Sequence, residues 1–184
     1  IPETAGLLPE NPQGQDQAPW AAYGQGTQLY SPLQLANYVA TLVSGGKHCQ
    51  AHLLKAAKTY DHSSVVAAGN TEPLNQIDIS DENLRAVKEG MKGLVEGTLS
   101  PYFKSCVVSA GAKTGTSQVR ADTKNHGVFI CFAPYDDPEI AVAIAIERAD
   151  AGAALASTAV NILNAYFAPG EDDSAVTGEN QLLP

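Results

Sequence analysis

The sequence Lys113-Thr114-Gly115-Thr116, followed by the apolar runs GVFICFA (127–133) and IAVAIAI (140–146), decides the fold of this chain. Short apolar runs rich in β-branched and aromatic residues are typical of strands. The turn 134–138 joins the second run to the third, and so short a connection implies an antiparallel hairpin. The sequence therefore predicts three strands, the first of which carries the lysine motif.

The run 140–146 is apolar on both faces, because isoleucine and valine alternate with alanine. We expect this strand to be central in the sheet and covered on both sides. Its alanine face leaves room for a helix to approach closely. The segment 154–167 is the candidate for that helix, with one apolar line formed by Leu155, Ala159, Ile162 and Tyr166.

Two earlier segments have the signals of capped helices. Ser31, Pro32 and Gln34 form a capping box with proline at the first helical position, and two glycines at 45–46 end this helix. Ser80 caps a second helix that closes at Gly97, with an apolar stripe at Leu84, Val87, Met91, Leu94 and Val95. Short strands and loops are expected over 47–78. Helices packed on an antiparallel sheet define an α+β fold.

The composition of the 184 residues bounds the remaining choices. An apolar fraction of 44% supports a sizeable core, and a formal charge of -9 argues against a nucleic-acid partner. The three cysteines cannot all pair within the chain, and Cys131 is expected to be a small buried hydrophobe. We predict one domain portion over 1–167, with a surface loop at 1–19, and an acidic disordered tail over 168–184.

The lysine motif can bind an anion if it forms a strand. Alternation places Thr114 and Thr116 on one face and Lys113 and Gly115 on the other. Two hydroxyls about 7 Å apart can flank one carboxylate, and the ammonium of Lys113 adds positive potential. A backbone N–H near Thr116 can donate to an oxyanion. The four letters alone leave open an ordinary surface lysine in a threonine-rich strand.

The motif resembles the K-T-G element of penicillin-binding proteins and serine β-lactamases. Further motifs resemble class B penicillin-binding proteins in the same order along the chain, and together they cover residues 6–167. These motifs are Gly24-Gln25-Gly26 with Ser31-Pro32-Leu33-Gln34-Leu35-Ala36, Gly90-Met91 with Glu96-Gly97-Thr98, and Asn125-His126 with Phe132-Ala133-Pro134 and Pro138-Glu139.

The resemblance implies the C-terminal part of a transpeptidase domain with the penicillin-binding-protein/serine β-lactamase-like fold. Its implied activity is D,D-transpeptidation of peptidoglycan stem peptides through an acyl-serine, with β-lactams acylating the same serine and no cofactor or metal. Lys113 would assist proton transfer, Thr114, Gly115 and Thr116 would bind the substrate, and the amide of Thr116 would complete the oxyanion hole. Implied partners are the cell-wall synthesis machinery and the N-terminal remainder of the protein, whose anchor would hold it outside the cytoplasmic membrane.

Two family motifs, Ser-x-x-Lys at a helix start and Ser-x-Asn, have no convincing counterpart here. Ser44-Gly45-Gly46-Lys47 stands at a predicted helix end, so its serine and lysine would not share a helical face. We therefore expect the nucleophile to precede Ile1. The 184 residues alone would then expose apolar surface and be insoluble or molten.

The alternatives are a β-lactamase or D,D-carboxypeptidase of the same superfamily, or a protein of a different class, a non-catalytic β-lactam sensor or scaffold. Other chemical candidates are weaker. His48-Cys49-x-x-His52 has a metal-like spacing without a second ligand pair nearby. His126 is placed to line a cleft, Glu147-Arg148 to form an ion pair, and Asp136, Asp137 and Glu139 to occupy a solvated turn.

Overall fold

The computed structural model describes residues 5–8, 19, 23–118 and 123–168. Most of the predicted N-terminal loop (1–19) and nearly all of the predicted acidic tail (168–184) lie outside these residues. No helix in the described ranges is long and apolar enough to cross a bilayer.

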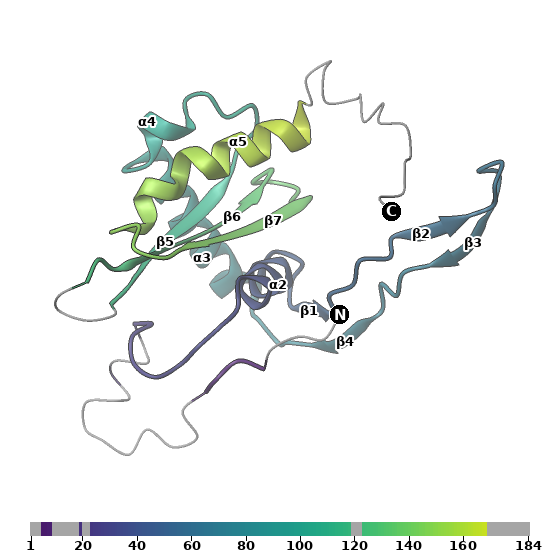
Figure 1. The fold of residues 1–184 in the computed structure, drawn as a ribbon, viewed down its shortest axis with the longest axis horizontal. Helices are drawn as coiled ribbons and strands as arrows, with labels where there is room; N and C mark the ends of the chain where they lie inside the picture. The colour runs from purple at the N-terminus through teal and green to yellow at the C-terminus, as the bar shows by residue number, and fades with distance from the viewer. Residues whose placement is uncertain (1–4, 9–18, 20–22, 119–122, 169–184) are drawn as a thin grey trace, which may run out of the picture.

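The three predicted strands form one antiparallel sheet in the order β5-β6-β7 (Figure 1). They are β5 (Gly111–Ser117), β6 (His126–Ala133) and β7 (Ile140–Ile146). Lys113 lies opposite Ile130, and Ala133 lies opposite Ile140 across the predicted hairpin. The prediction that 140–146 is central was wrong, because β6 is the middle strand and β7 has one described neighbour.

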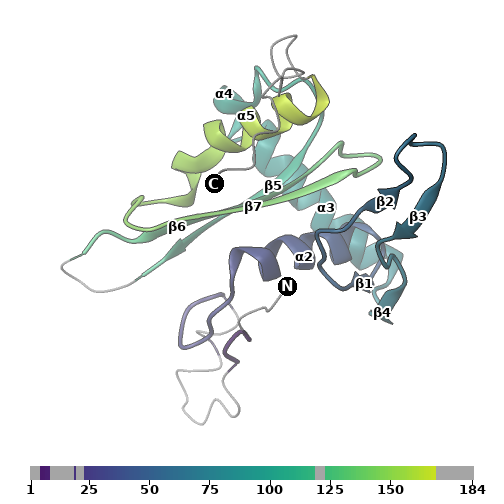
Figure 2. The same ribbon diagram turned by 45° about the vertical axis from the view of Figure 1, so that its right-hand side comes forward.

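Both faces of β7 are nevertheless covered, as its two apolar faces require. Figures 1 and 2 show α5 (Ala156–Phe167) on one side of the sheet and α2 (Pro32–Val43) on the other. Ala141 packs in a cluster with Val39 of α2, whereas Val142 packs in the cluster that contains Leu163 of α5. The helix on the alanine face is therefore α2, and the expectation for 154–167 was wrong.

The buried stripe of α5 also differs from the predicted line. Leu155 and Ala159 are buried as expected, but Ile162 and Tyr166 are 38% and 52% exposed. The helix instead buries Ala156, Val160 and Leu163. Residues 152–155, expected in part to begin this helix, form the 3-10 turn η1 (Gly152–Leu155), so the α-helix begins at Ala156.

The two capped helices begin and end where the sequence indicates. In α2, Ser31 Oγ accepts from the Gln34 amide and the Gln34 side chain accepts from the Ser31 amide, which completes the capping box. Helix α3 (Asp81–Glu96) begins after Ser80 and ends at Gly97. The short helix α4 (Ser100–Phe103), which was not predicted, buries Phe103 behind the sheet.

Residues 47–76 form two small antiparallel pairs, as the mixed pattern suggested. Strand β1 (Lys47–Cys49) pairs with β4 (Pro73–Gln76), and β2 (Ala56–Lys58) pairs with β3 (Val65–Ala68). The β2–β3 hairpin extends away from the main sheet (Figure 1), and every residue of both strands is exposed. This region does not contribute to the two buried clusters.

Strand β6 supplies the core on both sides of the sheet. Phe129 and Cys131 are buried on the α5 side, and Phe132 is buried on the α2 side. Burial raises the pKa of the Cys131 thiol to about 12, and Cys106 adds to the shift. Cys131 is thus the buried hydrophobe that the sequence predicted.

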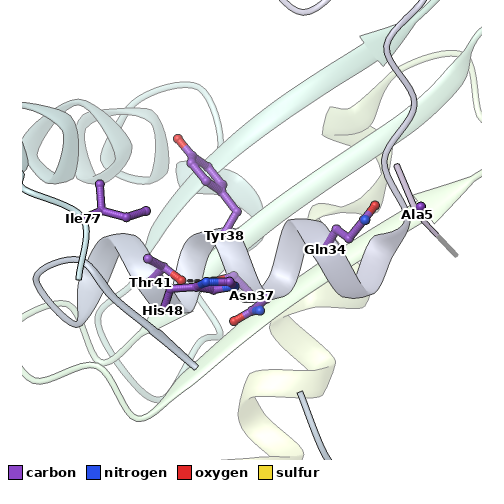
Figure 3. Close-up of a pocket in the computed structure, with 7 residues that line it drawn as sticks. All are labelled: Ala5, Gln34, Asn37, Tyr38, Thr41, His48 and Ile77. Atoms are coloured by element: carbon purple, nitrogen blue, oxygen red, sulfur yellow. Dashed lines mark hydrogen bonds between the residues drawn. The ribbon is translucent and has the colours of Figure 1, made fainter. Parts of the chain in front are cut away.

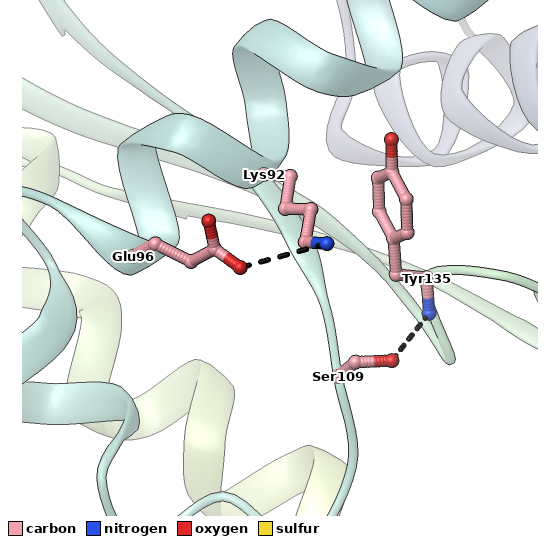
Figure 4. Close-up of polar contacts among 4 residues, drawn as sticks. All are labelled: Lys92, Glu96, Ser109 and Tyr135. Atoms are coloured by element: carbon pink, nitrogen blue, oxygen red, sulfur yellow. Dashed lines mark hydrogen bonds and ion pairs between the residues drawn. The ribbon is translucent and has the colours of Figure 1, made fainter.

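The turn after β6 is fixed to α3 and to the segment leading into β5 (Figure 4). The Tyr135 amide donates to Ser109 Oγ at 3.1 Å. The Lys92 ammonium, which pairs with Glu96 at 3.6 Å, lies 4.9 Å from the centre of the Tyr135 ring. These contacts join the β6–β7 hairpin to the two elements that position the lysine motif.

Candidate active site

The lysine motif lies on β5, an outer strand of the sheet with β6 as its described neighbour. Lys113 and Gly115 lie opposite Ile130 and Val128, and Thr114 lies opposite the buried Phe129. Residues opposite each other in an antiparallel pair point to the same face of the sheet. Ile130 packs in the cluster beside α2 and Phe129 in the cluster beside α5, and this shows which side of the sheet each motif residue faces. Lys113 and Gly115 face the α2 side, and Thr114 and Thr116 face the α5 side.

Lys113 borders a groove of about 430 Å³ between the sheet, α2 and α3. The rest of the lining is largely apolar and comprises Tyr38, Leu42, Val87, Gly90, Met91 and Ile130. The Lys113 ammonium donates to the carbonyl of Thr114. The ion pairs of the described residues use other lysines and arginines. The charge of Lys113 is therefore available to an anion in this groove.

A second groove, of about 600 Å³, lies at the other end of the motif. Gly115, Thr116 and Ser117 of β5 form one side, and residues of the loop before α2 form another, among them Tyr23, Gln25 and Tyr30. Gln25 Nε2 donates to the Thr116 carbonyl at 2.8 Å, although the residues are 91 positions apart. Thr114 lines neither groove.

The contact of Gln25 with the motif could not be read from the sequence. Gly24-Gln25-Gly26 indicated a flexible turn, and its resemblance to a family element gave no role to the glutamine. Only the two flanking glycines hinted at this contact. Glycine allows backbone conformations that other residues rarely adopt, and the side chain between them can then point in an unusual direction.

The backbone of the motif is packed tightly on the α5 side. At Gly152, the first residue of η1, an added Cβ would lie 2.2 Å from the Val128 carbonyl oxygen and 2.8 Å from the Gly115 nitrogen. Only a residue without a side chain allows η1 to approach this closely. The position of Gly115 at the second groove thus depends on Gly152, which packs against its backbone.

His126 lines the second groove, where the sequence placed it. Its Nδ1 accepts from the Arg148 amide at 3.2 Å, which fixes the ring against the end of β7. Glu147 and Arg148 do not form the suggested ion pair; in this region Lys124 pairs with Asp150 at 2.6 Å. Asp136, Asp137 and Glu139 are all exposed, as expected for a solvated turn.

The Ser44–Lys47 pair has a structural role. Ser44 caps the C-terminal end of α2, and its hydroxyl donates to the carbonyls of Thr41 and Lys47 at 3.1 and 3.2 Å. Gly45 and Gly46 between them have φ values of 73° and 92°, so the chain has left the helix before Lys47. This serine is not arranged as a nucleophile with a lysine base.

The histidine–cysteine cluster lacks the ligands of a metal site. Within the described ranges, no three His, Cys, Asp or Glu side chains gather closely enough to hold an ion. His48 instead lines a hollow of about 540 Å³ beside α2, with Asn37 and Thr41 (Figure 3). Thr41 Oγ1 there donates to the Asn37 carbonyl, and no residue of the lysine motif takes part.

Comparison with known proteins identifies the family to which this chain belongs. The family described as "Penicillin binding protein transpeptidase domain" matches residues 2–167, and the chain belongs to this family. The predicted α+β transpeptidase-type fold and the predicted family are therefore confirmed.

Individual relatives agree with this assignment. Penicillin-binding protein 2A of Bacillus subtilis is 30% identical over 64% of this chain and 18% of its own length. Peptidoglycan D,D-transpeptidase MrdA of Haemophilus influenzae is 28% identical over 90% of this chain and 29% of its own length. Among solved structures, penicillin-binding protein 2B of Streptococcus pneumoniae has the same fold, with a TM-score of 0.74 over 92% of this chain and 30% of that chain at 22% identity. The chain thus spans less than a third of these relatives.

Proposed function

We propose that this chain forms one wall of the active site of a peptidoglycan D,D-transpeptidase that also binds penicillins. The observation that carries the proposal is the position of Lys113-Thr114-Gly115-Thr116. The motif lies on an outer strand between two grooves, and its lysine has no ion-pair partner among the described residues. Membership of the transpeptidase family supports the same conclusion.

In the proposed reaction, a serine hydroxyl attacks the carbonyl of the penultimate D-alanine of a stem peptide. The terminal D-alanine leaves as an amine, and an amine of a neighbouring strand then takes the acyl group from the serine. Lys113 assists proton transfer and attracts the terminal carboxylate. Because Thr114 and Thr116 face away from Lys113, their hydroxyls bind that carboxylate in this proposal across the open edge of β5, and the Thr116 amide stabilises the oxyanion.

The nucleophile belongs, in this proposal, to residues that precede Ile1. The apolar groove beside Lys113 supports a further contact on this side of the sheet, because Tyr38 and Val87 remain 57% and 45% exposed there. The proposed location of the protein is outside the cytoplasmic membrane, held by a segment not in this chain. Its proposed partners are stem peptides, β-lactams and the cell-wall synthesis machinery.

Labelling of the intact protein with a fluorescent penicillin tests this function. A covalent adduct that survives denaturation and persists for many minutes is the expected result, with protein pretreated with unlabelled penicillin as the control. The absence of an adduct would contradict acyl-serine catalysis. Rapid release of hydrolysed penicillin would instead indicate a β-lactamase.

A further inference from the structure

The hydrogen bond between Gln25 and the motif strand ties two distant parts of the chain at the site itself. Gln25 Nε2 lies 2.8 Å from the carbonyl oxygen of Thr116. The bond is exposed to solvent and lies at the rim of the groove that Gly115 and Thr116 border. The Thr116 carbonyl oxygen thus accepts a hydrogen bond from a side chain whose place water or another donor can take.

The loop that carries Gln25 is built to present it. Gly24 and Gly26 have φ values of 85° and 112°, a region that residues with side chains rarely adopt. An added Cβ at either glycine would meet nothing within 4 Å. The glycines are therefore explained by the conformation of the loop rather than by tight packing, and this conformation points Gln25 at β5.

The covered carbonyl belongs to the outer edge of β5. Residues two apart on a strand direct their carbonyls to the same edge. The carbonyls of Thr114 and Thr116 each accept from a side chain, Lys113 and Gln25 respectively. Because β6 occupies the other edge, we place both carbonyls on the edge that a further extended segment would use.

We propose that Gln25 is a latch on the Thr116 carbonyl, displaced when a ligand's amide N–H pairs with this edge of β5. An extended peptide adds to a strand edge through its main-chain hydrogen bonds, so the N–H of an acyl donor competes with the glutamine amide for the same oxygen. The latch weakens binding of acyl donors with such an N–H and leaves donors without one unaffected. This inference rests on the proposed transpeptidase function.

The size of the effect follows from the value of one exposed hydrogen bond. A net contribution of about 0.5–1.5 kcal/mol corresponds to about a two- to tenfold change in affinity. Displacement occurs when the ligand binds, before the acyl bond forms. The change therefore belongs to the dissociation constant of the non-covalent complex, and the first-order acylation constant stays the same.

The test compares two β-lactams on the intact protein. Benzylpenicillin has an acylamino N–H beside its β-lactam ring, whereas a carbapenem such as imipenem has a hydroxyethyl group there. Gln25→Met keeps the length of the side chain and removes the donor. We expect acylation by benzylpenicillin to become about two- to tenfold faster at low ligand concentration, with acylation by imipenem unchanged. Gln50→Met, an exposed glutamine outside both grooves, should leave both rates unchanged.

Gln25→Leu provides a second measurement if the methionine variant folds poorly. The leucine side chain cannot donate to the Thr116 carbonyl and adds no charge, so the ratio of the two rates should still rise. An equal loss for both ligands would show that Gln25 positions the strand, and an unchanged ratio would also overturn the latch. Wild-type protein that forms no adduct with either ligand would contradict the proposed function itself.

Discussion

At the scale of single residues, the proposed chemistry depends most on Lys113. Replacing it with alanine removes both the charge and the proton donor, so we expect acylation by fluorescent penicillin to slow by about 10²–10⁴-fold. Lys113→Arg keeps the charge but cannot exchange a proton near neutral pH, and should recover ligand binding without recovering the acylation rate. Lys58→Ala, in the exposed hairpin, is the matched control. An alanine variant with a rate near wild type would remove Lys113 from the mechanism.

The raised pKa of Cys131 predicts how the stability of the protein depends on pH, independently of the candidate site. Its pKa is about 12 in the folded protein and 9.0 in the exposed thiol, so the folded state holds the proton more tightly. Its contribution to stability is complete below pH 9 and is lost as pH rises from 9 to 12, by about 1.4 kcal/mol per pH unit. Urea unfolding of the intact protein at pH 8 and pH 10 should show a larger loss of unfolding free energy for wild type than for Cys131→Ala. Equal losses would mean that Cys131 is not protected by burial.

At the scale of elements, the contact between η1 and the motif strand decides how β5 is held. Gly152→Ala would place a methyl group 2.2 Å from the Val128 carbonyl oxygen, so η1 or β5 has to move. We expect a loss of stability of about 1–3 kcal/mol and slower acylation, because Gly115 lies at the point of contact. Gly93→Ala, in α3 with open space around it, should instead stabilise the protein by about 0.5–1 kcal/mol. Unfolding midpoints and acylation rates of the two variants, both measured in the intact protein, separate these effects.

The elements themselves were largely predictable, because their signals are local. The capping box at Ser31 and the alternation in 140–146 fixed a helix and a strand with short-range chemistry. The choice of helix for each face of β7 was not local. Either face could accept either helix by hydrophobicity, and the tertiary packing decided that α2 lies on the alanine face.

At the scale of the whole molecule, the same limit applies to the site. The motif at 113–116 could be found because four adjacent residues carry it. The latch at Gln25 could not, because its partner is 91 positions away and the bond exists only after α2 and the sheet have assembled. Long-range contacts between polar groups leave no periodic pattern in the sequence, so they become visible only in the folded structure.

The distribution of apolar surface over the molecule gives the last prediction. The groove beside Lys113 is lined by Tyr38, Leu42, Val87, Met91 and Ile130, and Tyr38 and Val87 are about half exposed. Apolar surface of this kind normally binds another part of a protein. A polypeptide of residues 1–184 alone should therefore bind a hydrophobic dye and lack a cooperative thermal transition, as a molten state does. Val87→Lys should reduce the dye binding that arises at this groove. The same change at the exposed hairpin residue Val66 should leave dye binding at the groove unchanged. A monodisperse polypeptide that melts cooperatively would show that the groove needs no covering, and that the two clusters on either side of the sheet are sufficient for folding.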